Sequence, residues 1–331
     1  MIDQSFQLLA CQYLHAHVEK LQNELSGAKI AEDIECIHQS RVATRQLRAG
    51  LIFFDICFSA RKMKKWLSQI RRVAKKLGTA RDRDVQVQFI GEFLSNLNKR
   101  QRRYKPGINR LLLRLRQGRE KIQPEVVKSV AAFNSSGVLA DIHGEIEKVL
   151  FSFKGEQIPL QTQFVFQHTQ ERVTGQLREL CSHQGSLADP SDKDGHHRMR
   201  ISAKRLRYTL EICDAAFEGE LGPIITDVKK TQTYLGDIHD CDVWEDYLGR
   251  FIVEEKQRTV DYFGHSRPFV SIQRGLDYLN GRCVKRRDIL LGEFVGYWNT
   301  ISQEGSWDKL QSMIDARLKE YQESSPMNPT A

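Results

Sequence analysis

One motif occurs twice in this chain of 331 residues, and it constrains the fold more than any other feature. Residues 38–48 read HQSRVATRQLR, and residues 197–207 read HRMRISAKRLR. A second motif follows each copy, LGTARDRDV at 77–85 and LGDIHDCDV at 235–243. The first motif recurs at an offset of 159 residues and the second at 158. Two motifs repeated in the same order at nearly the same offset indicate a tandem duplication.

On a helix, the first motif places its basic side chains on one face, because they are three, four and three residues apart. The members of this row are His38, Arg41, Arg45 and Arg48 in the first copy, and His197, Arg200, Lys204 and Arg207 in the second. Like charges one helical turn apart destabilise an exposed helix by about 0.2–0.5 kcal/mol per pair, so folding alone does not favour the row. A bound polyanion would favour it. The alternative is a solvated helix face paired with carboxylates, but neither row contains an acidic residue.

Composition favours helices and an acidic partner. Leu, Arg, Lys, Glu and Gln are abundant, prolines number only 8, and no convincing strand alternation occurs. Residues 1–155 carry 28 Lys and Arg against 15 Asp and Glu, whereas residues 156–331 carry 22 against 27. We therefore predict an all-α protein of two tandem antiparallel helical bundles, 1–155 and 156–325, with a disordered tail at 326–331. The overall charge of +8 points to nucleic acid, a phosphate polymer or a membrane surface.

The cysteines and the apolar runs indicate a cytoplasmic protein that is not inserted in a membrane. The number of cysteines is odd at 7, and no two have C-x-x-C spacing, which is typical of reduced thiols. The first residues have no basic segment followed by an apolar one, so no signal peptide is expected. The longest apolar run, 51–58, is interrupted by Asp55 and is too short to span a bilayer.

Apolar periodicity and turn residues predict the positions of the helices. Gly78 is expected to end one helix and Asp82 to begin the next, with Asp33 as an N-cap of the first motif helix. Lys105, Pro106 and Gly107 are expected to form a loop. The predicted helical ranges are 4–25, 33–58, 61–77, 82–97, 108–122, 125–152, 162–183, 196–217, a helix ending near 234, another through 255, 274–296 and 307–322.

The paired motifs resemble those of the CHAD family (conserved histidine α-helical domain), and the resemblance covers nearly the whole chain. It implies two similar helical bundles, related by a pseudo-twofold axis, whose basic helix faces line a central groove or pore. Members bind inorganic polyphosphate, and some associate with polyphosphate granules. Many members also carry a triphosphatase domain marked by an E-x-E-x-K motif, which is absent here. The resemblance thus implies a stand-alone, non-enzymatic polyphosphate-binding protein.

Carried over residue by residue, the resemblance assigns polyphosphate binding to both basic rows and to basic residues that precede each glycine of the second motif. Position 204 is Lys where the first copy has Arg45, and lysine cannot grip phosphate with two parallel hydrogen bonds as arginine does. The expected binding residues are His38, Arg41, Arg45, Arg48, Arg71, Arg72, His197, Arg200, Lys204, Arg205, Arg207, Lys229 and Lys230.

Two alternatives remain open, and no cofactor is expected. The basic first half permits nucleic-acid binding, although no helix-turn-helix or set of stacking aromatics is evident. The pairs Asp82/Asp84 and Asp240/Asp242 permit a metal-dependent phosphohydrolase, although helix capping or the bracing of arginines explains them more simply. No metal site is expected at His38 or His197, because neither has a His or Cys at ligand spacing in its motif.

Overall fold

The structure, a computed structural model, describes residues 2–28, 34–154 and 156–324. These residues form helices joined by short turns and include no β-strand, which confirms the predicted all-α fold. The α-helices, with the bounds that the structure gives them, are α1 (Gln4–Ala28), α2 (Ile34–Phe53), α3 (Ala60–Ser95), α4 (Lys105–Ser135), α5 (Val138–Ser152), α6 (Gln163–Ser182), α7 (Lys193–Cys213), α8 (Gly222–Phe263), α9 (Phe269–Gln303) and α10 (Ser306–Ser324).

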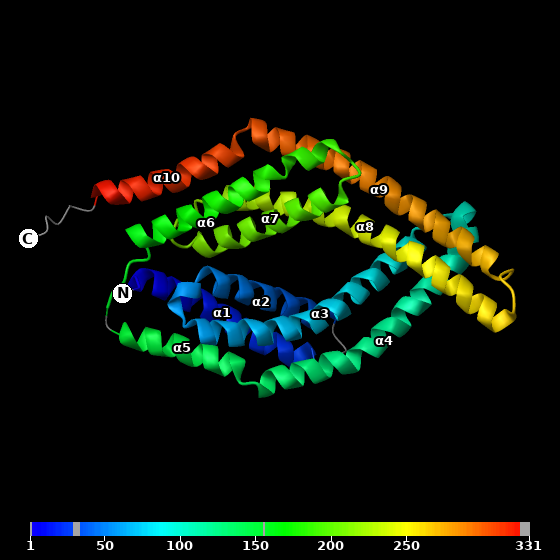
Figure 1. The fold of residues 1–331 in the computed structure, drawn as a ribbon, viewed down its shortest axis with the longest axis horizontal. Coiled ribbons are helices and arrows are strands. Elements are labelled where there is room, and N and C mark those ends of the chain that lie inside the picture. The colour runs from blue at the N-terminus through cyan, green and yellow to red at the C-terminus, as the bar shows by residue number, and fades with distance from the viewer. Residues whose placement is uncertain (1, 29–33, 155, 325–331) are drawn as a thin grey trace, which may run out of the picture.

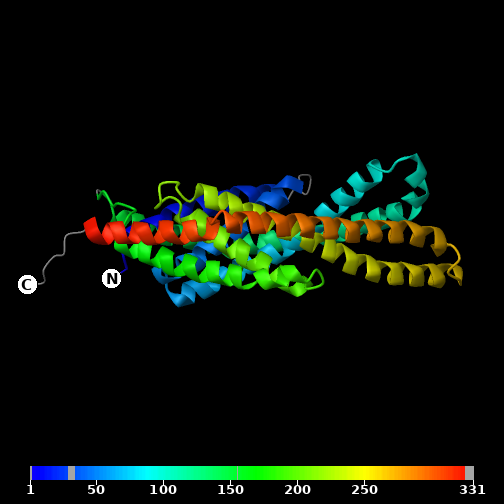
Figure 2. The same cartoon turned by 90° about the horizontal axis from the view of Figure 1, so that it is seen from above.

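The molecule is elongated, with two groups of helices side by side and two long hairpins at one end (Figure 1). Helices α1, α2, α3 and α5 pack together in the first group, and α6, α7, α8 and α10 in the second. The α3–α4 and α8–α9 hairpins reach away from the chain ends, and Figure 2 shows their far ends pointing apart. Helix α4 contacts α9 where the two hairpins lie against each other. Both halves have the same order of helices, as a duplication would give. The duplication, and the twofold axis that would relate the halves, are interpretations of the sequence.

The main hydrophobic core includes residues from both halves. Phe6 of α1 is fully buried, and its ring lies 5.4 Å from Phe164 and 4.7 Å from His168 of α6, measured between centroids. A smaller cluster, which contains Ile108 of α4 and Leu276 of α9, joins the two hairpins. Burial of about 25 cal/mol per Å² of apolar surface makes these two cores the main source of stability. They hold the two halves together from the chain ends to the hairpins.

Both predicted breaks at the glycines of the second motif are wrong. Helix α3 continues through Gly78 and Asp82, and α8 continues through Gly236. A glycine inside a helix costs only about 1 kcal/mol relative to alanine, and burial of Trp66, Ile70 and other residues on both sides offsets that cost. The acidic pairs therefore lie in helix interiors, and the capping interpretation of these pairs is wrong.

The predicted loop at residues 105–107 is also wrong, because it forms the first turn of α4. Pro106 lies in this turn, where its missing N–H has no helical partner to lose. The same helix continues through Pro124. The break comes instead at Gly137, whose φ of 65° lies in the left-handed region that glycine adopts readily. The helix predicted over 125–152 is thus the end of α4 followed by α5.

Three other predictions concern the chain ends, the cysteines and the membrane. The tail at 326–331 and the proposed cap Asp33 lie outside the described residues. No disulfide joins any of the cysteines in the described ranges. Within the described ranges, no helix combines the length and apolarity needed to cross a bilayer.

Candidate functional site

The two motif helices, α2 and α7, contact each other at the centre of the molecule. Each helix buries its leucines in the core, where Leu47, Leu51, Leu206 and Leu210 are fully enclosed. Because those residues occupy the core-facing sides, much of the basic row of each helix is left facing the gap between the two groups of helices.

A cavity of about 840 Å³ opens between α2, α3, α6 and α7. We call it the central cavity. Its lining includes one carboxylate, Asp82, and nine basic side chains: Arg41, Arg45, Arg48, Arg71, Lys75, Arg172, Arg200, Lys204 and Arg205. Seven of the thirteen predicted residues therefore line one cavity, and they come from both copies of the motif.

Most of these cations have no carboxylate partner. Arg41 pairs with Asp82 at 2.6 Å, Arg205 with Glu179 at 3.0 Å and Arg172 with Asp55 at 3.5 Å. Among the described residues, no ion pair involves the other six, which are Arg45, Arg48, Arg71, Lys75, Arg200 and Lys204. The central cavity thus holds a surplus of positive charge that the protein itself does not neutralise.

The electrostatics of Lys204 show that the two basic rows act on each other. Burial, followed by the charges of Arg200, Arg45, Arg48 and Arg41, lowers the pKa of this ammonium from 10.5 to about 8. Three of those arginines belong to α2, whereas Lys204 belongs to α7. Burial is also the largest cause that lowers the pKa of Arg48, and Arg71 adds to it. Each charged form is disfavoured because it is partly removed from water near like charges.

Several buried polar atoms at the cavity have no hydrogen-bond partner in the part of the chain that the structure describes. The Nε atoms of Arg45 and Arg48 are buried without an acceptor, and so is the hydroxyl of Tyr208. The guanidinium of Arg45 lies 5.6 Å from the centre of the Tyr208 ring, which fixes its orientation. Buried donors are rarely left unpaired in proteins, so these atoms favour a ligand rich in acceptor oxygens.

Six predicted residues do not line the central cavity. Arg207 pairs with Glu211 on its own helix at 3.0 Å, and Lys230 lies over the ring of Tyr297 at 4.3 Å. The ring of His197 packs against His239, with centroids 4.6 Å apart. Burial, then Arg81, lowers the pKa of His38. The remaining two, Arg72 and Lys229, are exposed.

Two basic residues of the central cavity and the tyrosine that packs against Arg45 were not predicted from the sequence. Lys75 lies one helical turn beyond Arg71, so its spacing on α3 could have revealed it. Tyr208 directly follows the second motif and could have been included by adjacency. Arg172 belongs to α6 and reaches the cavity only through tertiary packing, so no local sequence signal marks it.

The second aspartate of each acidic pair binds an arginine from the following helix. Asp84 accepts a hydrogen bond from Nε of Arg119 at 2.6 Å, and Asp242 accepts one from Nε of Arg287 at 2.5 Å. Asp82 accepts from Arg41 at 2.6 Å. Burial raises the pKa of Asp240, while Arg200 opposes the shift. These contacts fit the bracing of arginines, and they occupy carboxylate oxygens that a metal ion would need.

A family model described as the CHAD domain matches residues 12–249. The crystal structure of the CHAD domain from the plant Ricinus communis is similar with a TM-score of 0.62 at 18% sequence identity, over 90% of this chain and 93% of that chain. No curated protein matches the sequence. At this identity, the structural likeness shows a common fold and nothing more.

Proposed function

This chain belongs to the CHAD family, and from that premise we propose that it binds inorganic polyphosphate in the central cavity without chemically altering it. The observation that carries the proposal is the surplus of unpaired cations contributed by both motif helices. Polyphosphate presents about one negative charge per phosphate and no bases. It therefore needs a line of donors rather than aromatic stacking platforms, and nine of the residues that line this cavity are basic.

The physical basis is charge neutralisation. Arginine forms two parallel charge-assisted hydrogen bonds with phosphate oxygens, the strong type of hydrogen bond. Phosphates within the cavity would give acceptors to the unpaired donors of Arg45 and Arg48. They would also turn the repulsion around Lys204 into attraction. The ligand therefore relieves an unfavourable arrangement that the fold maintains in its absence.

The same proposal covers location and partners. The odd number of cysteines and the absence of C-x-x-C spacing in the sequence fit the reducing cytoplasm, where we place the protein. Association with polyphosphate granules follows directly if long chains are bound. Nucleic acid would be a poorer ligand, because the lining of the central cavity offers its bases two aromatic side chains, Phe53 and Tyr208, against nine basic ones.

The test is charge reversal of four cavity residues, Arg41, Arg45, Arg200 and Lys204, each to Glu. We expect at least a tenfold loss of affinity for long-chain polyphosphate in a titration at fixed salt. The control reverses four basic residues of the exposed segment at the far tip of the α3–α4 hairpin, namely Lys99, Arg100, Arg102 and Arg103. Both variants change net charge equally, so only a difference between them reports on the cavity.

Three outcomes would overturn the proposal. One is binding within a factor of two of the unmodified protein after the cavity reversal, with helical content confirmed by circular dichroism. Another is displacement of polyphosphate by duplex DNA at equal phosphate charge, which would favour nucleic-acid binding. The third is orthophosphate release with magnesium that is lost in Asp240→Asn, which would indicate a phosphohydrolase.

A further inference from the structure

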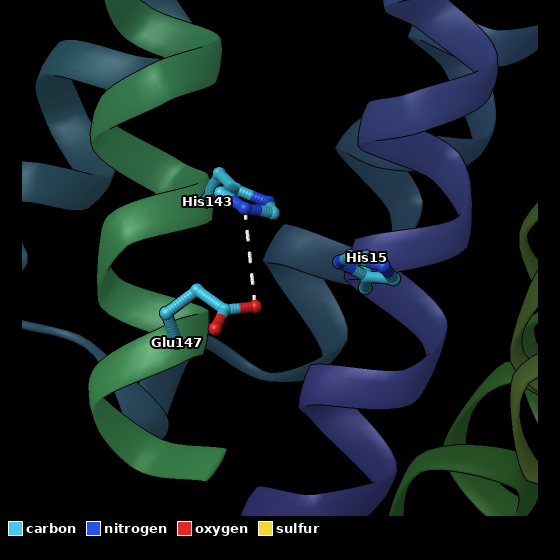
Figure 3. Close-up of side chains that lie close together, drawn as sticks. All are labelled: His15, His143 and Glu147. Atoms are coloured by element: carbon cyan, nitrogen blue, oxygen red, sulfur yellow. Dashed lines mark ion pairs between the residues drawn. The ribbon is translucent and has the colours of Figure 1, made fainter. Parts of the chain in front are cut away.

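A cluster of possible metal ligands lies between α1 and α5 (Figure 3). His15 projects from α1 toward His143 and Glu147, which are one turn apart on α5. One ligand atom from each residue lies within 4.8 Å of the others. The two imidazole rings are 5.4 Å apart between centroids. The geometry points to a binding site for Zn²⁺, or a divalent ion of the same nitrogen- and oxygen-binding class, at His15, His143 and Glu147.

The ligand set suits zinc. Two imidazoles and one carboxylate are the ligands of a zinc site that keeps an open position for water, with metal-to-ligand distances of about 2.0–2.2 Å. Around such an ion, neighbouring ligand atoms lie about 3.5 Å apart, so the ligands must close by roughly 1 Å. The side chains of His143 and Glu147 are 46% and 56% exposed, so they can turn inward without disturbing the core.

A fourth residue, Glu19, completes the usual surroundings of a metal-bound histidine. Its carboxylate lies 3.4 Å from Nε2 of His15, one turn away on α1. The other ring nitrogen, Nδ1, is buried and makes no hydrogen bond with any described residue. Metal-binding histidines commonly donate one ring N–H to a carboxylate while the other nitrogen binds the ion. Glu19 therefore leaves Nδ1 of His15 as the ligand atom.

The two helices that carry the cluster are packed into the core. Leu14 of α1 precedes His15 in the sequence, and Ile142 and Ile146 of α5 precede His143 and Glu147; all three apolar side chains are fully buried. The thiol of Cys11 also donates to the backbone carbonyl of Ile146 at 3.9 Å. Sites built on packed helices hold their geometry better than sites on loops. A bound ion would therefore cross-link the helices at the two ends of the first half.

The experiment is a calorimetric titration of ZnCl₂ into the full chain after chelator treatment, in a phosphate-free buffer. We expect one high-affinity equivalent, with at least a tenfold loss in both His143→Ala and Glu147→Gln. The matched control is His17→Ala on the same helix, because Nδ1 of His17 already donates to the carbonyl of Tyr13 at 2.7 Å. This control should keep the affinity of the unmodified protein.

A second readout follows thermal unfolding. At a zinc concentration 100 times Kd, the ratio of folded to unfolded protein should rise roughly 100-fold, and His143→Ala should abolish the rise. Absence of a tight equivalent, or unchanged zinc affinity in His143→Ala, would overturn the site. A loss in His17→Ala equal to that in His143→Ala would do the same. None of these results depends on polyphosphate, so the site and the proposed function stand or fall separately.

Discussion

Lys204 is the residue at which folding and ligand binding oppose each other most directly. Burial, and then the charges of four arginines, lower the pKa of its ammonium to about 8. The unfolded chain, with the ordinary value of 10.5, therefore binds more protons between pH 8 and 10.5. Stability contributed by this group is lowest below pH 8 and increases as pH rises through that window.

Replacing Lys204 by Met should therefore stabilise the free protein while weakening polyphosphate binding. At pH 7 and low salt we expect a gain of about 1 kcal/mol, or roughly 2 °C in Tm, because a like charge leaves the cavity. Calorimetric melting of the ligand-free protein measures the gain. Lys256→Met on the exposed face of α8 is the control and should leave Tm unchanged. A lower Tm in Lys204→Met would contradict the strain assigned to this charge.

Polyphosphate binding near pH 8.5 should take up protons. Phosphate charge beside Lys204 raises the pKa of the ammonium toward its ordinary range, so the deprotonated fraction becomes charged on binding. Titration calorimetry in two buffers of different ionisation enthalpy measures this uptake. We expect up to about one proton per site, falling to none at pH 6.5 and in Lys204→Met. Equal apparent enthalpies in the two buffers at pH 8.5 would count against it.

At the scale of the element, the second motif lies inside α3 and α8, and each helix continues through the glycine of that motif without a break. Gly236→Ala should stabilise the protein by about 0.5–1 kcal/mol, because an added Cβ meets nothing within 4 Å and alanine favours the helix. Gly107→Ala should do the reverse, since its Cβ would lie 2.0 Å from the carbonyl oxygen of Ile272 where α4 crosses α9. Urea unfolding of both variants measures the difference, and destabilisation by Gly236→Ala would show that the glycine serves another purpose.

At the scale of the whole molecule, the two halves together make one anion site, so affinity should depend steeply on salt. If the six unpaired cations of the central cavity each neutralise a phosphate, the slope of log K against log salt should be about −4. This corresponds to a loss of roughly 300-fold between 50 and 200 mM salt. Filter binding across this range measures the slope. The double variant Arg45→Gln, Lys204→Gln should reduce the slope by about 1.4, whereas an unchanged slope would mean that these residues do not contact the ligand.

Periodicity predicted most helices but failed at particular residues. The apolar positions of α1, α6 and α7 gave bounds within a few residues, because those helices are amphipathic in isolation. The predicted breaks at Gly78, after residue 234 and between residues 122 and 125 do not occur, because packing on both sides keeps the helices continuous. Local propensity is worth about 1 kcal/mol for glycine, whereas burial of one large apolar side chain is worth about 1.5–3 kcal/mol, so tertiary packing prevails.

The all-helical fold and the alignment of cations on each motif helix follow from residue spacing, because a helix repeats every 3.6 residues wherever it is placed. Which cations share a space depends on how helices far apart in the sequence pack. Packing brings Arg172 of α6 and Lys75 of α3 into the central cavity, and turns Arg72 and Lys229 out to solvent. It also sets His15 beside His143, across 128 residues that no local pattern connects. Periodicity relates side chains on one helix, whereas a binding site is formed by side chains from several helices.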